Sequence, residues 1–199
     1  MLDLSEQEIQ LRMSRIWAMP NPFTFHIKPV REFILAYVEG VGNNLNDWFD
    51  PFAGTNPFKL KYSNDLNPEM PTTFHMDAVD FLLDLKKLLA PPVPGAEGDM
   101  QFSGAFFDPP YTLHQTNQVY KGFGVRKPIS LTKDLIAPLI KMNGIVLTFG
   151  HNSGGMGLKR GFKLLEVLLV PHGGSHDDTI CTAEKKVTRW KTGPSVVHY

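Results

Sequence analysis

The chain has 199 residues, of which 42% are hydrophobic and 20% are charged, as is usual for one globular domain. Lys plus Arg equals Asp plus Glu at 20 each, so the chain lacks the basic excess of proteins that hold long nucleic acid unaided. No apolar run approaches a membrane span, and residues 1–12 lack the apolar segment of a signal peptide. Cys181 is the one cysteine, so no internal disulfide can form. We expect a single cytoplasmic domain that does not contact membranes, with Cys181 buried rather than nucleophilic.

The first predicted element is a helix from Pro29 to about Glu39, which follows an N-terminal extension of residues 1–22. Proline is favoured at the first helical position because it lacks an N–H that would be unpaired there anyway. Apolar residues recur at helical spacing and are expected in the core. They are Val30, Phe33, Ile34, Tyr37 and Val38.

A short strand is predicted at Trp48–Asp50, followed by the turn Pro51–Thr55. A strand, an acid and a turn of small residues allow the backbone to approach a ligand closely. Asn56 follows this turn, and asparagine tolerates a left-handed backbone better than other non-glycine residues. Asn56 can therefore hold a turn that would otherwise need glycine. The alternative is an ordinary loop without a ligand.

The alternating stretch from Lys61 ends in an acid and predicts a second strand. In a nucleotide-binding unit, an acid at this point hydrogen-bonds the ribose hydroxyls. Asp65 is preferred because it directly follows the strand, and Glu69 remains the alternative. A helix is then expected from Ala78 to Leu89, where Asp77 can cap the helix, contact a ligand, or do both.

Gly104–Phe107 predicts a buried strand that ends at Asp108. Pro109 and Pro110 cannot continue a strand or begin a helix, because they lack backbone donors and fix φ. The acid, a rigid turn and the ring of Tyr111 are thus held at the carboxyl end of a strand, where open α/β sheets bind ligands. This suits an exocyclic amine: Asp108 and the Pro109 carbonyl accept its hydrogens, and Tyr111 stacks on the base.

Beyond this turn, residues 112–127 are expected to form a mobile flap over the target base. Leu131–Met142 predicts a helix that Pro138 kinks or shortens, and Gly144–Gly150 predicts a buried strand. The glycine-rich segment 151–157 lacks the Lys-Ser/Thr ending of a triphosphate-binding loop. It borders the base pocket through His151 or Asn152, or it simply turns the chain.

Two last strands are predicted at Leu164–Val170 and Thr179–Val187, joined by a polar hairpin. The hairpin contains side chains that can ligate metals: His172, His176, Asp177 and Asp178. We expect a polar hairpin tip and no metal. The cluster Lys185–Lys191 interleaves Trp190 with cations, which suits a phosphate and base-stacking patch or a solvated tail over residues 188–199.

Taken in order, the segment Thr24–Ile34, the loop Asp50–Gly54, the acids Asp65 and Asp77, and the turn Asp108–Tyr111 resemble the S-adenosylmethionine-dependent amino-methyltransferases. The likeness is chiefly to the DNA adenine-N6 enzymes, including small ones of phages and prophages, and it spans about residues 24–186. The chain departs from the family pattern at Asn56, where the family has a second glycine.

The resemblance implies a class I methyltransferase (Rossmann-like) fold: an α/β, seven-stranded sheet with helices on both faces and an antiparallel last strand. It implies catalysis by Asp108, Pro109, Pro110 and Tyr111. It also implies a set of residues that contact S-adenosylmethionine. They are Phe25, Lys28, Asp50, Pro51, Phe52, Ala53, Gly54, Asp65, Met76, Asp77 and Asp108.

The predicted function is methyl transfer to the N6 amine of adenine in DNA, in a bacterial or phage-infected cytoplasm. Residues expected to contact the substrate are Tyr111, Tyr120, Lys121, Arg126, Lys127, His151 and Asn152. The partner is duplex or single-stranded DNA, with RNA as a further candidate. No target-recognition domain is expected, so the flap, a partner subunit, a homodimer or low sequence specificity must fill that role. Alternatives are an RNA adenine or cytosine-N4 methyltransferase and a cofactor-free scaffold subunit.

Overall fold

The computed structural model describes residues 10–40, 45–89, 102–110, 128–174 and 176–189. Within these ranges one sheet has the strand order β1-β6-β7-β5-β4-β2-β3. Its strands are β1 (Arg12–Arg15), β2 (Trp48–Asp50), β3 (Tyr62–Ser63), β4 (Phe102–Phe107), β5 (Ile140–Gly150), β6 (Phe162–Val170) and β7 (Thr179–Lys186). The predicted flap and the substrate residues Tyr111, Tyr120, Lys121, Arg126 and Lys127 lie outside the described residues, as does Trp190.

The sheet is mixed. Strand β2 pairs in parallel with β3 and β4, and β4 pairs in parallel with β5. Strand β7 is antiparallel to both β5 and β6. The predicted α/β architecture with an antiparallel last strand is therefore confirmed. The carboxyl ends of β2, β3, β4 and β5 point toward one edge of the sheet, which is where such sheets bind ligands.

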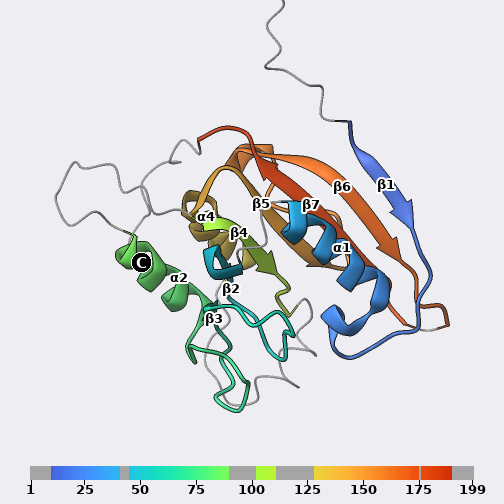
Figure 1. Ribbon diagram of the computed structural model, residues 1–199, viewed down its shortest axis with the longest axis horizontal. Coiled ribbons are helices and arrows are strands. Elements are labelled where there is room, and N and C mark those ends of the chain that lie inside the picture. Colours follow the sequence, from blue (N-terminus) through green and yellow to red (C-terminus); the bar gives the residue numbers. More distant parts are fainter. Residues whose placement is uncertain (1–9, 41–44, 90–101, 111–127, 175, 190–199) are drawn as a thin grey trace, which may run out of the picture.

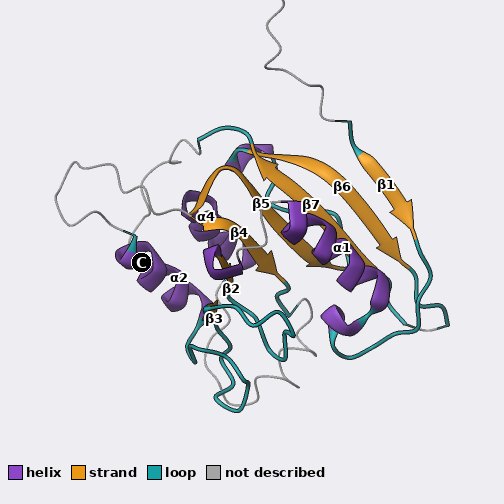
Figure 2. Cartoon of the chain, viewed as in Figure 1, coloured by secondary structure: helices purple, strands orange, loops and turns teal. Residues whose placement is uncertain are grey.

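Helices cover both faces of the sheet, as Figure 2 shows for α1 on the near face. Helix α1 (Lys28–Gly40) packs on one face, and α2 (Ala78–Leu88) and α4 (Ile129–Leu139) pack on the other. Adjacent rings of β4 serve different cores, since Phe106 joins the α1 cluster and Phe107 joins the α2–α4 cluster. This alternation explains why a strand covered on both faces is apolar throughout.

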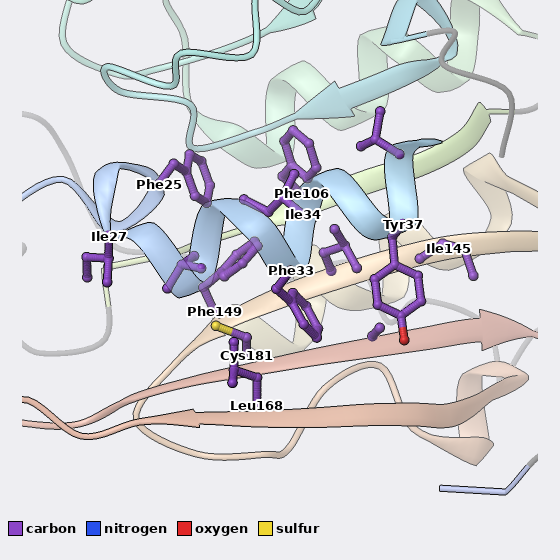
Figure 3. Close-up of a cluster of buried hydrophobic side chains, with 14 of the residues drawn as sticks. Phe25, Ile27, Phe33, Ile34, Tyr37, Phe106, Ile145, Phe149, Leu168 and Cys181 are labelled. Carbon is purple, nitrogen blue, oxygen red and sulfur yellow. The ribbon is translucent and has the colours of Figure 1, made fainter. Parts of the chain in front are cut away.

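The five residues predicted for the buried face of α1 are all in the core, which confirms that prediction. Figure 3 shows several of them with Phe106, Phe149 and Cys181. Cys181 is fully buried, as expected, and burial raises the pKa of its thiol. Strand β4 requires a glycine at position 104, because a Cβ there would lie 2.6 Å from the ring of Trp48 on the adjacent strand β2.

The predicted helix Leu131–Met142 is too long at its carboxyl end. Helix α4 stops at Leu139, directly after Pro138, and β5 begins at Ile140. The side chain of the buried Lys186 donates to the carbonyl oxygens of Ala137 and, at 2.7 Å, Ile140, which pairs acceptors freed at the helix end. The strand thus starts four residues before the predicted Gly144, with a register irregularity opposite β4.

Two differences concern the sheet edges. Strand β1, which pairs in parallel with β6, lies in the N-terminal extension where no strand was predicted. Arg12 anchors it through an ion pair of 2.7 Å with Glu166 and a hydrogen bond of 3.0 Å to the Tyr37 hydroxyl. Beyond β3, Asn64 and Phe74 form an isolated bridge that was not predicted either. Six strands were predicted by position, and β1 is the seventh strand of the described sheet.

Among the residues that the structure describes, no helix combines the length and apolar character that crossing a bilayer requires.

Candidate functional site

Acidic side chains gather where β2, β3 and β4 end. Asp50 is the last residue of β2, Asp65 follows β3, and Asp108 follows β4. Burial, together with the negative charges of Asp108 and Asp65, raises the pKa of Asp50 to about 7. Burial also raises the pKa of Asp65 and brings that of Asp108 to about 6. The sheet thus brings together three predicted site residues in a negatively charged cluster, which we call the acid cluster.

The loop after β2 is organised by the carboxylate of Asp50. Its Oδ1 accepts a hydrogen bond of 2.9 Å from the Phe52 amide, and its Oδ2 accepts one of 2.8 Å from the Asn56 side chain. The Asn56 Oδ1 in turn accepts a hydrogen bond of 2.8 Å from the Phe58 amide. The side chain of Asn56 therefore ties the end of β2 to the far end of the loop.

The left-handed backbone predicted for Asn56 is wrong. Among the described non-glycine residues, a positive φ occurs at Asn143, where it is 66°. In this loop Gly54 takes the left-handed conformation, with a φ of 48°. Asn56 acts here through its side-chain amide and not through a left-handed backbone. Compared with the glycine of the pattern that the sequence resembles, it adds a hydrogen bond to Asp50.

Asp65 connects the loop after β2 with the loop after β3. Its Oδ2 accepts a hydrogen bond of 3.1 Å from the Gly54 amide, and its Oδ1 accepts one of 2.8 Å from the Asn67 amide. The alternative acid, Glu69, is exposed, and its amide donates to Asn67. Asp65 therefore belongs to the acid cluster and supports the glycine turn.

Asn64 is a site residue that the sequence analysis missed. It is fully buried, and its Nδ2 donates to the carbonyls of Pro51 at 3.1 Å and Met76 at 3.0 Å. Its Oδ1 accepts from the Met76 amide at 3.1 Å. One side chain thus joins the loop after β2 to the segment before α2. Its position at a strand end, next to Asp65, was the only sequence signal, since its partners lie 12 and 13 residues away.

The segment before α2 is also engaged within the chain. The Met76 amide, expected to face the cofactor, donates to Asn64. The Asp77 side chain accepts a hydrogen bond of 2.9 Å from the Val79 amide and caps α2, as the capping alternative predicted. A ligand contact by Asp77 stays a prediction.

Asp108 is contacted by a residue of the 3-10 turn η1 (Thr24–His26). The Thr24 side chain hydrogen-bonds Asp108, and this bond and the nearby His151 both act to lower its pKa against the effect of burial. Thr24 was not predicted, because a lone hydroxyl among Phe23, Phe25 and Ile27 gave no signal by itself. The ring Nδ1 of His151 also lies 3.3 Å from the Asp178 carbonyl oxygen, and a contact of His151 with the substrate stays a prediction.

Phe25, which was predicted to touch the cofactor, belongs to the core. It is 5% exposed, and its ring centroid lies 4.9 Å from that of Phe149 and 5.7 Å from that of Phe106. Figure 3 shows these three rings in one buried cluster. Lys28, the other predicted contact of this segment, is exposed and forms a loose pair of 3.9 Å with Glu32.

The remaining predicted residues of the loop after β2 differ in access. Pro51 and Ala53 are buried, and the Ala53 amide donates to the Asn64 carbonyl at 2.8 Å. Phe52 is half-buried, with its ring edge-on to Phe107 at 5.8 Å between centroids. Pro109 is buried and Pro110 is half-buried.

The glycine-rich loop after β5 is held by side chains that use its backbone groups. The amides of Met156 and, at 2.8 Å, Gly157 donate to the carboxylate of Glu184. Lys133 of α4 donates to the carbonyls of Gly154 and, at 2.8 Å, Gly155. A cavity of about 460 Å³ lies against residues 153–160 and Glu184, and no acid of the cluster lines it.

Asn152 and the hairpin have local structural contacts. The Asn152 Oδ1 accepts a hydrogen bond of 2.9 Å from the Gly154 amide. Both ring nitrogens of His172 have partners at 2.9 Å, the Ala18 carbonyl and the Thr179 hydroxyl. In the described part of the chain, no three His, Cys, Asp or Glu side chains are grouped so that they could hold a metal ion.

No protein-family model matches the chain, and no curated protein does. Solved structures similar to it include a protein from Haemophilus influenzae named as a methylase, with 13% identity, a TM-score of 0.43, and coverage of 81% of this chain and 98% of that one. The N-methyltransferase NodS from Bradyrhizobium japonicum has 9% identity and a TM-score of 0.42, covering 80% and 98%. The precorrin-6y C5,15-methyltransferase from Geobacter metallireducens has 14% identity and a TM-score of 0.45, covering 85% and 94%. At these identities the likeness concerns the course of the backbone, and the chemistry must be argued from the site.

Proposed function

We propose that the chain transfers a methyl group from S-adenosylmethionine to the exocyclic N6 amine of adenine in DNA. The observation that carries the proposal is Asp108, an acid at the carboxyl end of β4 that precedes two prolines and interacts electrostatically with Asp50 of the glycine turn. The acid that would hold an amine and the loop that would hold a cofactor thus meet at one sheet edge.

The acid cluster fits the proposed cofactor on electrostatic grounds. Asp50 is repelled by both Asp65 and Asp108, and these carboxylates gain from a positive charge placed among them. S-adenosylmethionine, when bound, supplies a methyl group on a positively charged sulfur. Asp50 and Gly54 would line the methionine end of the site, and Asp65 would line its ribose side.

Asp108 acts on the amine by accepting a hydrogen bond, for which its ionised form is the stronger acceptor. The adjacent carbonyl of Pro109 is held by a rigid turn and accepts the second hydrogen. With both hydrogens bound, the amine nitrogen directs its lone pair out of the ring plane toward the methyl donor. The amine is held in place, so alignment rather than strong basicity supplies the rate. An adenine in duplex DNA must first leave the stack, at a cost of about a few kcal/mol.

The test measures transfer of labelled methyl from S-adenosylmethionine to duplex DNA, single-stranded DNA and RNA, with Asp108→Ala as the matched variant. Alanine removes the side-chain acceptor for the amine, whereas asparagine would keep one in its Oδ1. We expect label in the N6 position of adenine, lost by a factor of about 100 or more in the variant, with S-adenosylhomocysteine binding retained.

Other outcomes distinguish the alternatives. Label in RNA alone or at cytosine N4 would change the substrate and keep the reaction class. If the wild-type chain binds neither S-adenosylmethionine nor S-adenosylhomocysteine in calorimetry, the proposed enzymatic function is wrong. The alternative of a cofactor-free scaffold subunit would then be favoured.

A further inference from the structure

The N-terminal part of the described chain is basic although the whole chain is neutral. Residues 10–31 carry the cations Arg12, Arg15, Lys28 and Arg31 and no Asp or Glu, against a net charge of zero overall. Glu166 neutralises Arg12 through the ion pair that anchors β1. Arg15, Lys28 and Arg31 are exposed. This segment therefore presents positive charge to the solvent.

The same segment exposes large apolar side chains between β1 and η1. Trp17 is 59% exposed, Met19 is 68% exposed and Phe23 is 49% exposed. The ring of Phe23 is tilted against that of His26 with centroids 5.6 Å apart, and His26 is also exposed. We call Arg15, Trp17, Met19, Phe23 and His26 the arm strip. Exposed rings among cations are typical of surfaces that bind single-stranded nucleic acid, because bases stack on the rings and phosphates meet the cations.

The arm strip is fixed to the body of the domain. The Ile16 amide donates to the Leu169 carbonyl at 2.9 Å, and the Ala18 amide donates to the Pro171 carbonyl at 3.2 Å. Further along the chain, the Asn21 side chain accepts a hydrogen bond of 2.9 Å from the Phe23 amide. These bonds set the path of the backbone before any ligand arrives, which lowers the entropic cost of binding.

The arm strip leads directly to the acid cluster. Phe23 precedes Thr24, whose side chain hydrogen-bonds Asp108, and His26 ends the same 3-10 turn. Figure 1 shows the chain running from the end of β1 back to α1 at the end of the sheet where the loops after β2 and β3 lie. A base held at Asp108 would therefore have exposed rings beside it.

We propose that the arm strip binds the nucleotides next to the target base in a single-stranded or locally opened nucleic acid strand. Phe23 stacks on the adjacent base with the tilted His26 ring beside it, Trp17 stacks on a more distant base, and Arg15 contacts a phosphate. The inference rests on the proposed function, since it names how the same site would hold its substrate. It also accounts for nucleic-acid binding by a chain with no net positive charge.

The test uses fluorescence anisotropy of a fluorescein-labelled, single-stranded DNA that contains adenine, with S-adenosylhomocysteine present. Trp17→Ala and Phe23→Ala are each expected to weaken binding roughly tenfold. Arg15→Ala should reduce the slope of log affinity against log salt by about one. The matched control is Leu158→Ala, which truncates an apolar side chain that is 76% exposed on η3 (Leu158–Arg160), and it should bind like the wild type.

The other possible results separate the role of the arm strip from the proposed function. If the variants bind DNA as the wild type does, the proposed role of the arm strip is wrong. Methyl transfer to DNA by the wild type would still support the proposed function in that case. A wild type that neither binds nor methylates any nucleic acid would overturn both. A loss of S-adenosylhomocysteine affinity equal to the loss of DNA affinity would show that the variants act through the fold. A wild-type dimer that Trp17→Ala converts to a monomer would make the arm strip a protein interface instead.

Discussion

The Nδ2 of Asn56 donates a hydrogen bond of 2.8 Å to the Oδ2 of Asp50, an acid whose carboxylate is fully buried at the end of β2. This bond favours the ionised carboxylate, which burial and the neighbouring acids oppose. The loop after β2 therefore depends on an amide at a position where a glycine was expected from the family pattern. The consequence is that the charge of residue 56 should matter more than its size.

We predict that Asn56→Asp destabilises the fold more strongly at pH 8 than at pH 5. The substitution replaces a donor with a like charge, so the pKa of the carboxylate pair that it forms with Asp50 rises and ionisation at high pH costs folding free energy. The measurement is urea unfolding at both pH values. Asn56→Ala is the control, because it removes the donor without adding charge and should show a smaller difference. Equal losses for Asn56→Asp at both pH values would contradict the prediction.

Asn64 is expected to be the most sensitive polar position near the site. Asn64→Leu keeps the approximate size but leaves the Pro51 carbonyl and both backbone groups of Met76 without their partner. Each buried group left unpaired costs about 1–3 kcal/mol, so the loss in unfolding free energy for the three groups should be at least about 3 kcal/mol. Binding of S-adenosylhomocysteine, measured by calorimetry, should weaken at the same time.

The control for Asn64 is Asn143→Gly. Asn143 is exposed with a φ of 66°, a conformation that glycine adopts freely, so its replacement should change stability by no more than about 0.5 kcal/mol. If Asn64→Leu were as stable as this control, the hydrogen bonds of Asn64 would have no energetic importance.

The sheet could be predicted from the sequence because its strands have local signals. The apolar run before Asp108 and the alternating stretches of β6 and β7 each carry a recognisable pattern. Strand β1 could not be predicted in this way, because all four of its residues are exposed and what attaches it to the domain is pairing with β6 and the contact of Arg12 with Glu166. An edge strand of this kind is specified by partners that are distant in sequence.

For the site, the sequence predicted the acids but not the residues that position them. Asp50, Asp65 and Asp108 stand at strand ends, which is a local signal. Asn64 and Thr24 act through partners brought close by the fold, and their own neighbours in sequence say nothing of those contacts. For Phe25 the prediction named a cofactor contact, whereas the structure packs its ring against Phe149 in the core.

The acid cluster should make the free protein less stable as pH rises. The folded-state pKa of Asp50 is raised from 3.8 to about 7, so its contribution is fully present below about pH 4 and is lost as pH rises through 7. Asp108, raised to about 6, acts in the same direction. We expect the unfolding free energy to fall between pH 5 and pH 8 in urea titrations. Asp50→Asn should flatten this fall, and an unchanged slope in that variant would contradict the assignment to Asp50.

If the chain transfers methyl groups as proposed, Thr24 should shift the pH at which the transfer begins. The ionised form of Asp108 is the stronger acceptor for the amine, so the rate should rise with pH through a midpoint near the Asp108 pKa of about 6. The Thr24 side chain lowers that pKa by hydrogen bonding, and Thr24→Val removes the bond while keeping the size. The acid limb of the rate profile should therefore move to higher pH in Thr24→Val and return in Thr24→Ser, which restores a hydroxyl. A Thr24→Val profile that is lower at every pH but unshifted would mean that Thr24 only supports the fold of η1.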